Sequence, residues 1–222
     1  MSTYVLMCIL ESAPRRYDLG IRLLTFGAVG RAYERLIGHV GPGDLVLDLG
    51  CGTGALTLRA AARGATVKGI DVNAEMLDIA ERQSRRAGVE GRVELVEMGV
   101  AEVDGERDNT YDAVTAGLCF SELSPDELAY TLKQVRRILK PGGLLLVADE
   151  VKLRHVAIRL LHGLVRVPLT LLTYLITQQT THPIARLAEK MADADLQVVS
   201  VHSSALRSFS EFVALKPSGG SE

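Results

Sequence analysis

The chain has little cysteine and no tryptophan. Its 222 residues include three cysteines, Cys8, Cys51 and Cys119. No two of them fall at the spacing of a disulfide framework or a zinc site, so we expect reduced thiols in a cytoplasmic protein and no metal centre. An excess of one charge is missing as well: 25 Lys and Arg face 27 Asp and Glu, a net charge of −2. Nucleic-acid binders normally carry a basic surplus, so we expect no nucleic-acid partner.

A long uninterrupted apolar segment is also absent. Residues 4–10 are apolar, but they are too short for a membrane span and lack the basic leader of a signal peptide. Residues 156–176 are long enough, but Arg159, Arg166 and Pro168 interrupt them, which disfavours a buried spanning helix. With 47% hydrophobic and 23% charged residues, the composition is that of a globular protein rather than a disordered or fibrous one.

Short apolar runs alternate with helical patterns through the centre of the chain. Strands are predicted where the runs are too short for helices, at 45–49, 66–71, 93–97, 111–116 and 144–149. Helices are predicted at 53–63, 74–87 and 125–139, the last ended by a turn at 140–143. This alternation predicts an α/β fold, a doubly wound parallel sheet with helices on both faces.

The flanking segments complete a single domain over 1–222, because no repeat or linker divides it. N-terminal helices are predicted ahead of the first strand, and we expect 1–40 to cap the sheet. A helical insert, 151–182, follows the fifth strand. The chain then closes with a helix and two strands, whose short connection permits an antiparallel hairpin but no crossover. These last elements are predicted at 183–194, 197–201 and 209–216.

The segment Asp48-Leu-Gly-Cys-Gly-Thr-Gly54 is the most informative part of the sequence. An apolar strand leads into the glycines and a helix follows, so a ligand can lie against the backbone at a helix N-terminus. Gly50-x-Gly52-x-x-Ala55 also satisfies the fingerprint of dinucleotide-binding enzymes. Asp71, at the end of the second predicted strand, is placed to accept hydrogen bonds from a ribose diol.

Asp48 distinguishes two ligand classes. A carboxylate at this strand end would repel a pyrophosphate on the loop, which argues against the rival hypothesis of a nicotinamide-dependent dehydrogenase. The same carboxylate favours a ligand that carries an ammonium and a sulfonium group. S-adenosylmethionine carries both, together with a ribose for Asp71.

Three motifs in order make residues 40–150 resemble the class I S-adenosylmethionine-dependent methyltransferases. They are Asp48-Leu-Gly-Cys-Gly-Thr-Gly54, Gly69-Ile-Asp-Val-Asn-Ala-Glu-Met-Leu77 and Leu139-Lys-Pro-Gly-Gly143. The resemblance implies S-adenosylmethionine as cofactor. It also implies a seven-stranded, mostly parallel sheet whose last strand is antiparallel, in agreement with the expected hairpin.

The same resemblance implies the cofactor contacts, position by position. They are Asp48, Gly50, Cys51 and Gly52 for the methionine part, Asp71 for the ribose, Val72, Met76, Val100 and Ala101 for the adenine, and Gly117 and Leu118, within 116–119, beside the sulfonium. Val100 replaces the acidic residue that is usual at its position. The backbone N–H of Ala101 can still reach the adenine edge.

Residues 4–25, 97–102 and 178–183 resemble the corrinoid protein-associated methyltransferases. This resemblance implies a corrinoid protein as partner, and a small molecule or a corrinoid-associated centre as methyl acceptor. Ubiquinone- and menaquinone-type methyltransferases are the nearest well-known alternative, with a quinone or lipid acceptor at a membrane surface. A non-catalytic cofactor-binding subunit is a third hypothesis, because no catalytic base is obvious.

Methyl transfer from a sulfonium is an in-line displacement, so alignment of nucleophile, methyl group and sulfur can supply much of the acceleration. A base is needed only where the acceptor must lose a proton. Glu122 follows the fourth predicted strand and Asp149 ends the fifth, where open α/β sheets place ligands. Tyr17 lies in the segment that commonly folds over the cofactor in this superfamily. These three are the candidate catalytic residues, whereas Cys119 fits a small core residue better.

The insert carries a basic stripe over 152–166, formed by Lys152, His155, Arg159, His162 and Arg166. Their spacing places them on one face of an amphipathic helix. Three uses of this helix stay open: a substrate lid packed on the sheet, an interfacial helix on an anionic membrane, and a docking surface for an acidic partner such as a corrinoid carrier. The expected location is cytoplasmic, with a peripheral membrane contact left open.

Overall fold

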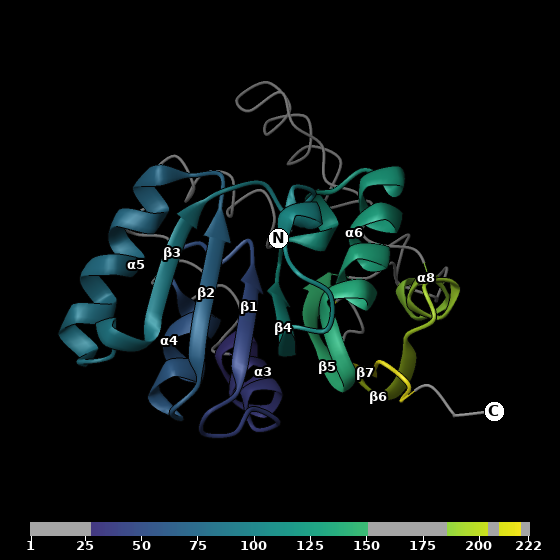
Figure 1. The fold of residues 1–222 in the computed structure, drawn as a ribbon, viewed down its shortest axis with the longest axis horizontal. Coiled ribbons are helices and arrows are strands. Elements are labelled where there is room, and N and C mark those ends of the chain that lie inside the picture. Colours follow the sequence, from purple (N-terminus) through teal and green to yellow (C-terminus); the bar gives the residue numbers. More distant parts are fainter. Residues whose placement is uncertain (1–27, 151–185, 204–208, 219–222) are drawn as a thin grey trace, which may run out of the picture.

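The computed structural model describes residues 28–150, 186–203 and 209–218. Seven strands form one sheet in the order β3-β2-β1-β4-β5-β7-β6 (Figure 1). Their bounds are Leu45–Leu49 (β1), Thr66–Asp71 (β2), Val93–Glu97 (β3), Tyr111–Gly117 (β4), Leu139–Glu150 (β5), Gln197–Ser203 (β6) and Phe209–Leu215 (β7). Strands β1 to β5 pair in parallel, whereas β7 runs antiparallel to both β5 and β6. The doubly wound α/β fold and its closing antiparallel hairpin are therefore confirmed.

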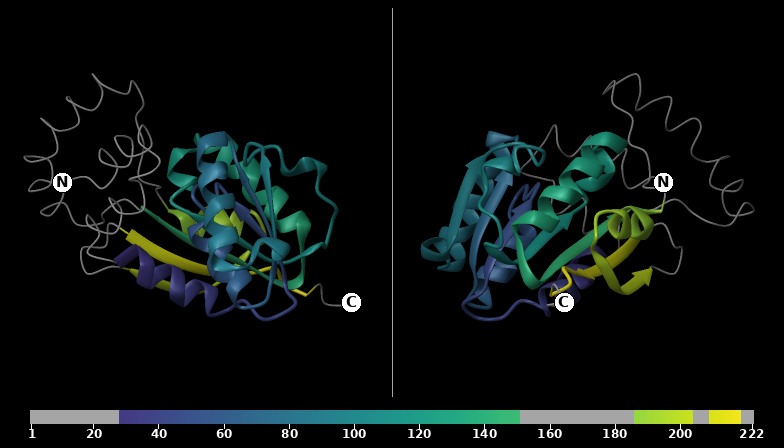
Figure 2. Two further views of the ribbon diagram at one scale, coloured as in Figure 1. Left: turned by 90° about the vertical axis from the view of Figure 1, so that its left-hand side faces the viewer. Right: turned by 45° about the vertical axis from the view of Figure 1, so that its right-hand side comes forward.

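Helices cover both faces of the sheet (Figure 2). They are Ala28–Ile37 (α3), Ala55–Ala62 (α4), Ala74–Ala87 (α5), Pro125–Ile138 (α6) and Leu187–Asp193 (α8), with short 3-10 turns at Glu90–Arg92 (η1), Val103–Gly105 (η2) and Phe120–Glu122 (η3). Successive side chains of a strand point to opposite faces. On β1, Val46 belongs to the core formed with α3 and α4, whereas Leu47 and Leu49 belong to the core formed with α6 and α8. Each face of the sheet thus has its own hydrophobic core.

Several expected boundaries are wrong by one or more residues, and two of them have a clear local reason. The helix expected to begin at Thr53 begins at Ala55, because Gly54 has a φ of +87°, outside the helical region. The turn at 140–143 lies inside β5 instead of ahead of it. There Gly142 N–H donates to the Lys216 carbonyl and Lys216 N–H donates to the Gly143 carbonyl, each at 2.9 Å. The chain after β7 therefore holds this turn in the sheet.

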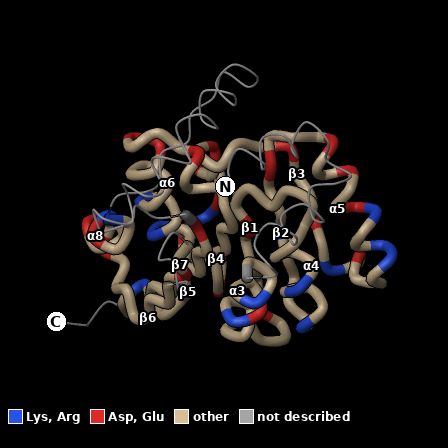
Figure 3. The backbone as a smooth tube through the Cα atoms, turned by 180° about the vertical axis from the view of Figure 1, so that it is seen from behind, with Lys and Arg blue, Asp and Glu red and all other residues tan. Residues whose placement is uncertain are grey.

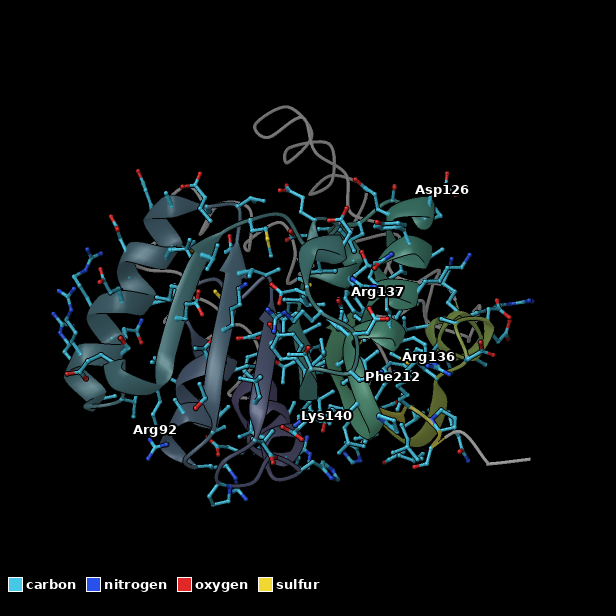
Figure 4. All side chains as sticks on the ribbon, viewed as in Figure 1. Arg92, Asp126, Arg136, Arg137, Lys140 and Phe212 are labelled. Atoms are coloured by element: carbon cyan, nitrogen blue, oxygen red, sulfur yellow. The ribbon has the colours of Figure 1, made fainter. Side chains whose placement is uncertain are left out.

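The parallel strands all end at one edge of the sheet, the upper edge in Figure 1. Acidic residues recur along this edge (Figure 3). Asp126, in the first turn of α6, lies on that side of the molecule, and Lys140 lies on the opposite side (Figure 4). Because open α/β sheets bind ligands at the carboxyl ends of their strands, the upper edge is where a ligand is expected.

Part of the predicted cap and all of the predicted insert lie outside the described residues. These are residues 1–27 of the cap, which include Tyr17, and the whole insert 151–182 with its basic stripe. Among the residues that the structure describes, no helix has the length and hydrophobicity that a bilayer crossing needs.

Candidate functional site

The loop between β1 and α4 leaves its backbone open to a ligand. Gly50, Gly52 and Gly54 have φ values of +61°, +53° and +87°, which side chains other than hydrogen disfavour. Gly50 also needs its small size, because a methyl group there would stand 2.6 Å from Cys119 Cβ. At Gly52 a methyl group would meet no atom of the described chain within 4 Å. The loop therefore combines a tight turn with an accessible backbone, as a ligand cradle requires.

Asp48 lies beneath this loop, and its carboxylate is hydrogen-bonded to other side chains and to the backbone of the protein. The residue is 1% exposed. Its Oδ2 accepts from the N–H of Thr57 (3.0 Å) and from the Thr57 hydroxyl (2.6 Å), and its Oδ1 accepts from the Thr115 hydroxyl (2.6 Å). Burial raises the pKa of Asp48 from 3.8 to about 6, although these hydrogen bonds oppose the rise. Asp48 thus connects β1 to α4 and β4. Because it is buried, its carboxylate can attract a cation bound on the loop only by its charge and not by direct contact.

Asp71 joins the same loop from the end of β2. Its Oδ2 accepts from Gly52 N–H at 2.8 Å, and its Oδ1 accepts from Asn73 N–H at 2.9 Å. A carboxylate offers about four lone-pair positions, so these contacts leave capacity for a ribose diol. Cys51 N–H also donates to the Ile70 carbonyl at 2.9 Å. The glycine loop and the end of β2 therefore form one cradle.

The residues expected around an adenine flank Asp71. Val72 is 71% exposed, whereas Met76 is buried in the first turn of α5. Val100 and Ala101 are half-buried in the segment after β3. Met98 N–H donates to the Asp71 carbonyl at 3.0 Å, which holds that segment beside the end of β2. The structure thus brings two of the expected segments together and leaves apolar surface at Val72.

The end of β4 continues into a turn with unusual backbone geometry. Leu118 has a φ of +59°, which is rare for a bulky side chain and tends to occur where function or packing demands it. Its N–H donates to the Ala148 carbonyl at 2.9 Å. Gly117 and Leu118 are therefore held at the carboxyl end of the sheet, as expected. Next to them, burial and then the nearby Asp149 raise the pKa of the Cys119 thiol. A neutral thiol is a poor nucleophile, which agrees with a packing role.

The carboxylates proposed as bases differ in environment. Asp149 is fully buried, and its Oδ2 accepts from Ser121 N–H at 3.1 Å. Glu122 is exposed at the end of η3. Because Ser121 also lies in η3, Asp149 supports the turn that carries Glu122. The roles of both residues, and of Tyr17, in proton transfer stay predictions.

One side chain at this edge, that of Tyr33, belongs to none of the motifs recognised in the sequence. Tyr33, on α3, is 7% exposed, and a methyl group at Gly117 would stand 2.6 Å from its hydroxyl oxygen. Burial, with smaller effects of Asp48 and Asp149, raises the pKa of Tyr33 above its usual value of 10.0. From the sequence, Tyr33 is expected only to be a core residue of a helix. Its position beside Gly117 becomes apparent only from the packing of α3 on the sheet.

Residues 46–143 match a family model described as a methyltransferase domain. The chain is also 35% identical, over 147 residues, to the ubiquinone/menaquinone biosynthesis C-methyltransferase UbiE of Escherichia fergusonii. That similarity covers 64% of this chain and 57% of the relative, so the chain spans little more than half the length of the curated relatives it matches.

Solved structures share the fold at lower identity. The cyclase SpnF matches with a TM-score of 0.68 and 20% identity, over 85% of this chain and 82% of that chain. A geranyl diphosphate methyltransferase in complex with S-adenosylmethionine matches with a TM-score of 0.65 and 18% identity, over 90% of each chain. These likenesses confirm a Rossmann-like methyltransferase fold, and they also show that the fold hosts more than one activity.

Proposed function

We propose that this chain, which belongs to the class I S-adenosylmethionine-dependent methyltransferases, transfers a methyl group from S-adenosylmethionine to a carbon atom of a quinone-type acceptor. The observation that carries the acceptor class is the 35% identity with UbiE, a C-methyltransferase of ubiquinone and menaquinone biosynthesis by name. This acceptor was the alternative that the sequence left open. The matched relatives favour it over the corrinoid-associated centre and over nicotinamide chemistry.

The residues of the site fit the cofactor. Gly52 and Asp71 offer an accessible backbone and a carboxylate with spare lone pairs, which suit an amino-acid arm and a ribose diol. Val72 offers exposed apolar surface for the adenine. Asp48 adds negative charge below the loop once it is ionised, and this charge favours a cationic ligand. When bound, the cofactor supplies a methyl group activated by its sulfonium.

The main contribution of this chain to the reaction is to hold the acceptor atom, the methyl group and the sulfur in line. Alignment of the reacting atoms can lower the barrier by about 7–11 kcal/mol. Elements of the sheet supply rigid support for it: Asp71 holds the glycine loop from β2, and Asp149 holds η3 from β5. Glu122, exposed on η3, is the residue we assign as base for the hydroxyl proton of a quinol acceptor.

Methyl transfer to a short-chain demethylmenaquinol, kept reduced during the assay, tests the acceptor class. We expect a carbon-methylated product that depends on both the protein and S-adenosylmethionine, and a Glu122→Gln variant that binds S-adenosylhomocysteine normally but forms product slowly. If the protein binds S-adenosylhomocysteine and methylates no quinol, the quinone proposal fails and the cofactor assignment stands. A blank in every acceptor screen would instead favour a non-catalytic subunit.

The association with a corrinoid protein and the membrane contact of residues 152–166 stay predictions. Residues 4–25 and 178–183, which carry most of the corrinoid resemblance, lie outside the described residues, as does the basic stripe.

A further inference from the structure

Arg136, on α6, has no partner for its charge within residues 28–150, 186–203 and 209–218. The residue is half-buried, its Nε is enclosed and makes no hydrogen bond, and none of the ion pairs in those ranges includes it. Thr131 Oγ1 is also buried without a partner, but Thr131 is 0% exposed, so no ligand can reach it. The internal segments 151–185 and 204–208 contain no Asp or Glu, so they supply no carboxylate. Because unpaired buried charge is costly, Arg136 indicates an anion from outside the protein.

The next residue, Arg137, shows what a structural arginine does in this protein. Its guanidinium donates five hydrogen bonds, to the side chains of Gln134 and Asp108 and to the backbone carbonyls of Val103, Asp104 and Glu106. An arginine carries five N–H donors, so all those of Arg137 are used to fasten α6 to η2 and the residues after it. Arg136 makes no comparable connection, which leaves its guanidinium for a ligand.

A second positive charge, that of Lys216, lies near Arg136. Lys216 is 6% exposed, and its Nζ donates to Asn109 Oδ1 at 2.7 Å and to the carbonyls of Leu139 and Arg137 at 2.6 and 3.3 Å. Three acceptors match the three donors of an ammonium group. Burial, and after it the charge of Arg136, lowers the pKa of Lys216, whereas Asp108 raises it. Arg136 and Lys216 are therefore close enough for their charges to act on one ligand.

This pair of cations lies away from the edge where the cofactor is expected. Asp126, in the first turn of α6, marks that edge, and Arg136 lies in the last turn, about 15 Å further along the helix axis. Figure 4 shows Arg136 on the side of α6 toward Phe212 and Lys140. The C-terminal end of a helix carries partial negative charge, which repels anions. Here Lys216 binds two carbonyls at that end and so offsets the repulsion.

We propose that Arg136 and Lys216 form a binding site for a phosphate group, free or carried by a small monoester, at the C-terminal end of α6. Arg136 supplies the hydrogen bonds, because a guanidinium matches phosphate oxygens in pairs. Lys216, whose donors are all used, supplies charge alone. Two positive charges favour a dianion over a single carboxylate. The site is separate from the methyl-transfer site, so the inference goes beyond the proposed function and does not depend on it.

Melting temperatures of the full chain in sodium phosphate and in sodium chloride of equal ionic strength test the site. Phosphate stabilises many proteins without binding them, so its effect is compared among the parent, Arg136→Gln and Arg85→Gln. Arg85, on α5, is exposed and paired with Glu81, and its replacement removes the same charge elsewhere. We expect phosphate to raise the melting temperature by about 3 °C more in the parent and in Arg85→Gln than in Arg136→Gln.

Calorimetry with inorganic phosphate and with glycerol 3-phosphate measures the binding directly and separates the two sources of the phosphate group. Arg136→Gln should bind either probe about tenfold more weakly than the parent. Binding of both probes by the parent would show that the phosphate group itself is recognised, and binding of the ester alone would identify a monoester as the ligand. Binding of neither probe by the parent would overturn the inference.

Without phosphate, Arg136→Gln should melt at the same temperature as the parent or higher, because an unpaired buried charge does not stabilise the fold. A lower melting temperature would show that a carboxylate of the chain pairs with Arg136, and would overturn the inference. An equal effect of phosphate on all three proteins would reduce it to a general salt effect, and an equal loss in both variants would reduce it to net charge. Displacement of S-adenosylhomocysteine by phosphate would place the anion at the carboxyl edge of the sheet. Each of these results would overturn the site.

Discussion

Replacing Asp48 with asparagine should change how the stability of this protein depends on pH. Burial raises the pKa of Asp48 from 3.8 to about 6 in the folded protein. Each pKa unit corresponds to about 1.4 kcal/mol, so ionisation of Asp48 costs the folded state about 3 kcal/mol relative to the unfolded chain. Since the folded pKa is the higher one, the stabilising contribution is complete below the unfolded pKa of 3.8 and is lost as the pH rises through about 6.

The amide side chain keeps the contacts of Asp48 and removes its titration. Its oxygen can accept from the N–H and the hydroxyl of Thr57, and its NH2 group can donate to the Thr115 hydroxyl, which can also accept. The difference in free energy of unfolding, Asp48→Asn minus parent, should therefore rise by about 3 kcal/mol between about pH 4 and about pH 7.5. Urea-induced unfolding of both proteins over this range measures that difference.

Asp112→Asn is the control, and its difference should change in the opposite direction. Burial alone would raise the pKa of Asp112, but hydrogen bonds from Lys140 and from Leu45 N–H outweigh it and lower that pKa. Ionised Asp112 thus stabilises the fold at neutral pH, and its replacement should cost more as the pH rises above the acid range. A difference for Asp48→Asn that is constant or falls with rising pH would refute the reasoning, because the hydrogen bonds would then outweigh burial.

Further predictions concern the cradle, the end of β4 and the α3 face. Asp71→Ala should weaken the calorimetric binding of S-adenosylhomocysteine by more than about 1 kcal/mol; an unchanged affinity would reject Asp71 as the ribose acceptor. Gly117→Ala should destabilise the fold by about 1–3 kcal/mol, because its Cβ would stand 2.6 Å from the Tyr33 hydroxyl oxygen. Adding Tyr33→Phe should recover part of that loss in chemical unfolding, and no recovery would place the steric conflict elsewhere. Arg35→Ala should destabilise by about 1 kcal/mol, since its Nε donates at 2.9 Å to the buried Glu211; equal stability would mean that solvent replaces this contact without cost.

Local signals explain how much of the fold the sequence predicts. The bounds of β1, β2, β3 and α5 agree with the predicted ranges. For α5 the reason is visible at both ends: the Asn73 side chain accepts from the N–H groups of Glu75 and Met76, and Gly88, with a φ of +67°, ends the helix. Such signals lie within a few residues of the boundary they set, so they can be recognised without tertiary structure.

The cradle was predictable for the same reason. Asp71 and the glycine loop stand at strand ends, and parallel strands that neighbour each other bring their ends to one edge. The hydrogen bond from Gly52 N–H to Asp71 Oδ2 joins the two segments in the structure, although the sequence assigned Asp71 only to the ribose. The direction of the Asp48 side chain could not be predicted from the sequence, because its partner Thr115 is 67 residues away, on β4. Its contacts depend on which strand lies beside β1.

By itself, the sequence determined an α/β sheet, a glycine loop with acidic residues at the strand ends, and a cofactor with a cationic centre and a ribose. Only the tertiary structure decided that Asp48 is buried under the loop, that the turn at 140–143 is held by Lys216, and that Tyr33 faces Gly117. Periodicity and capping act over a few residues, whereas these contacts join segments that meet only when the whole sheet is packed. For that reason the sequence indicates the chemistry of the site, and the fold decides which of the candidate side chains lie at its surface and which are buried beneath it.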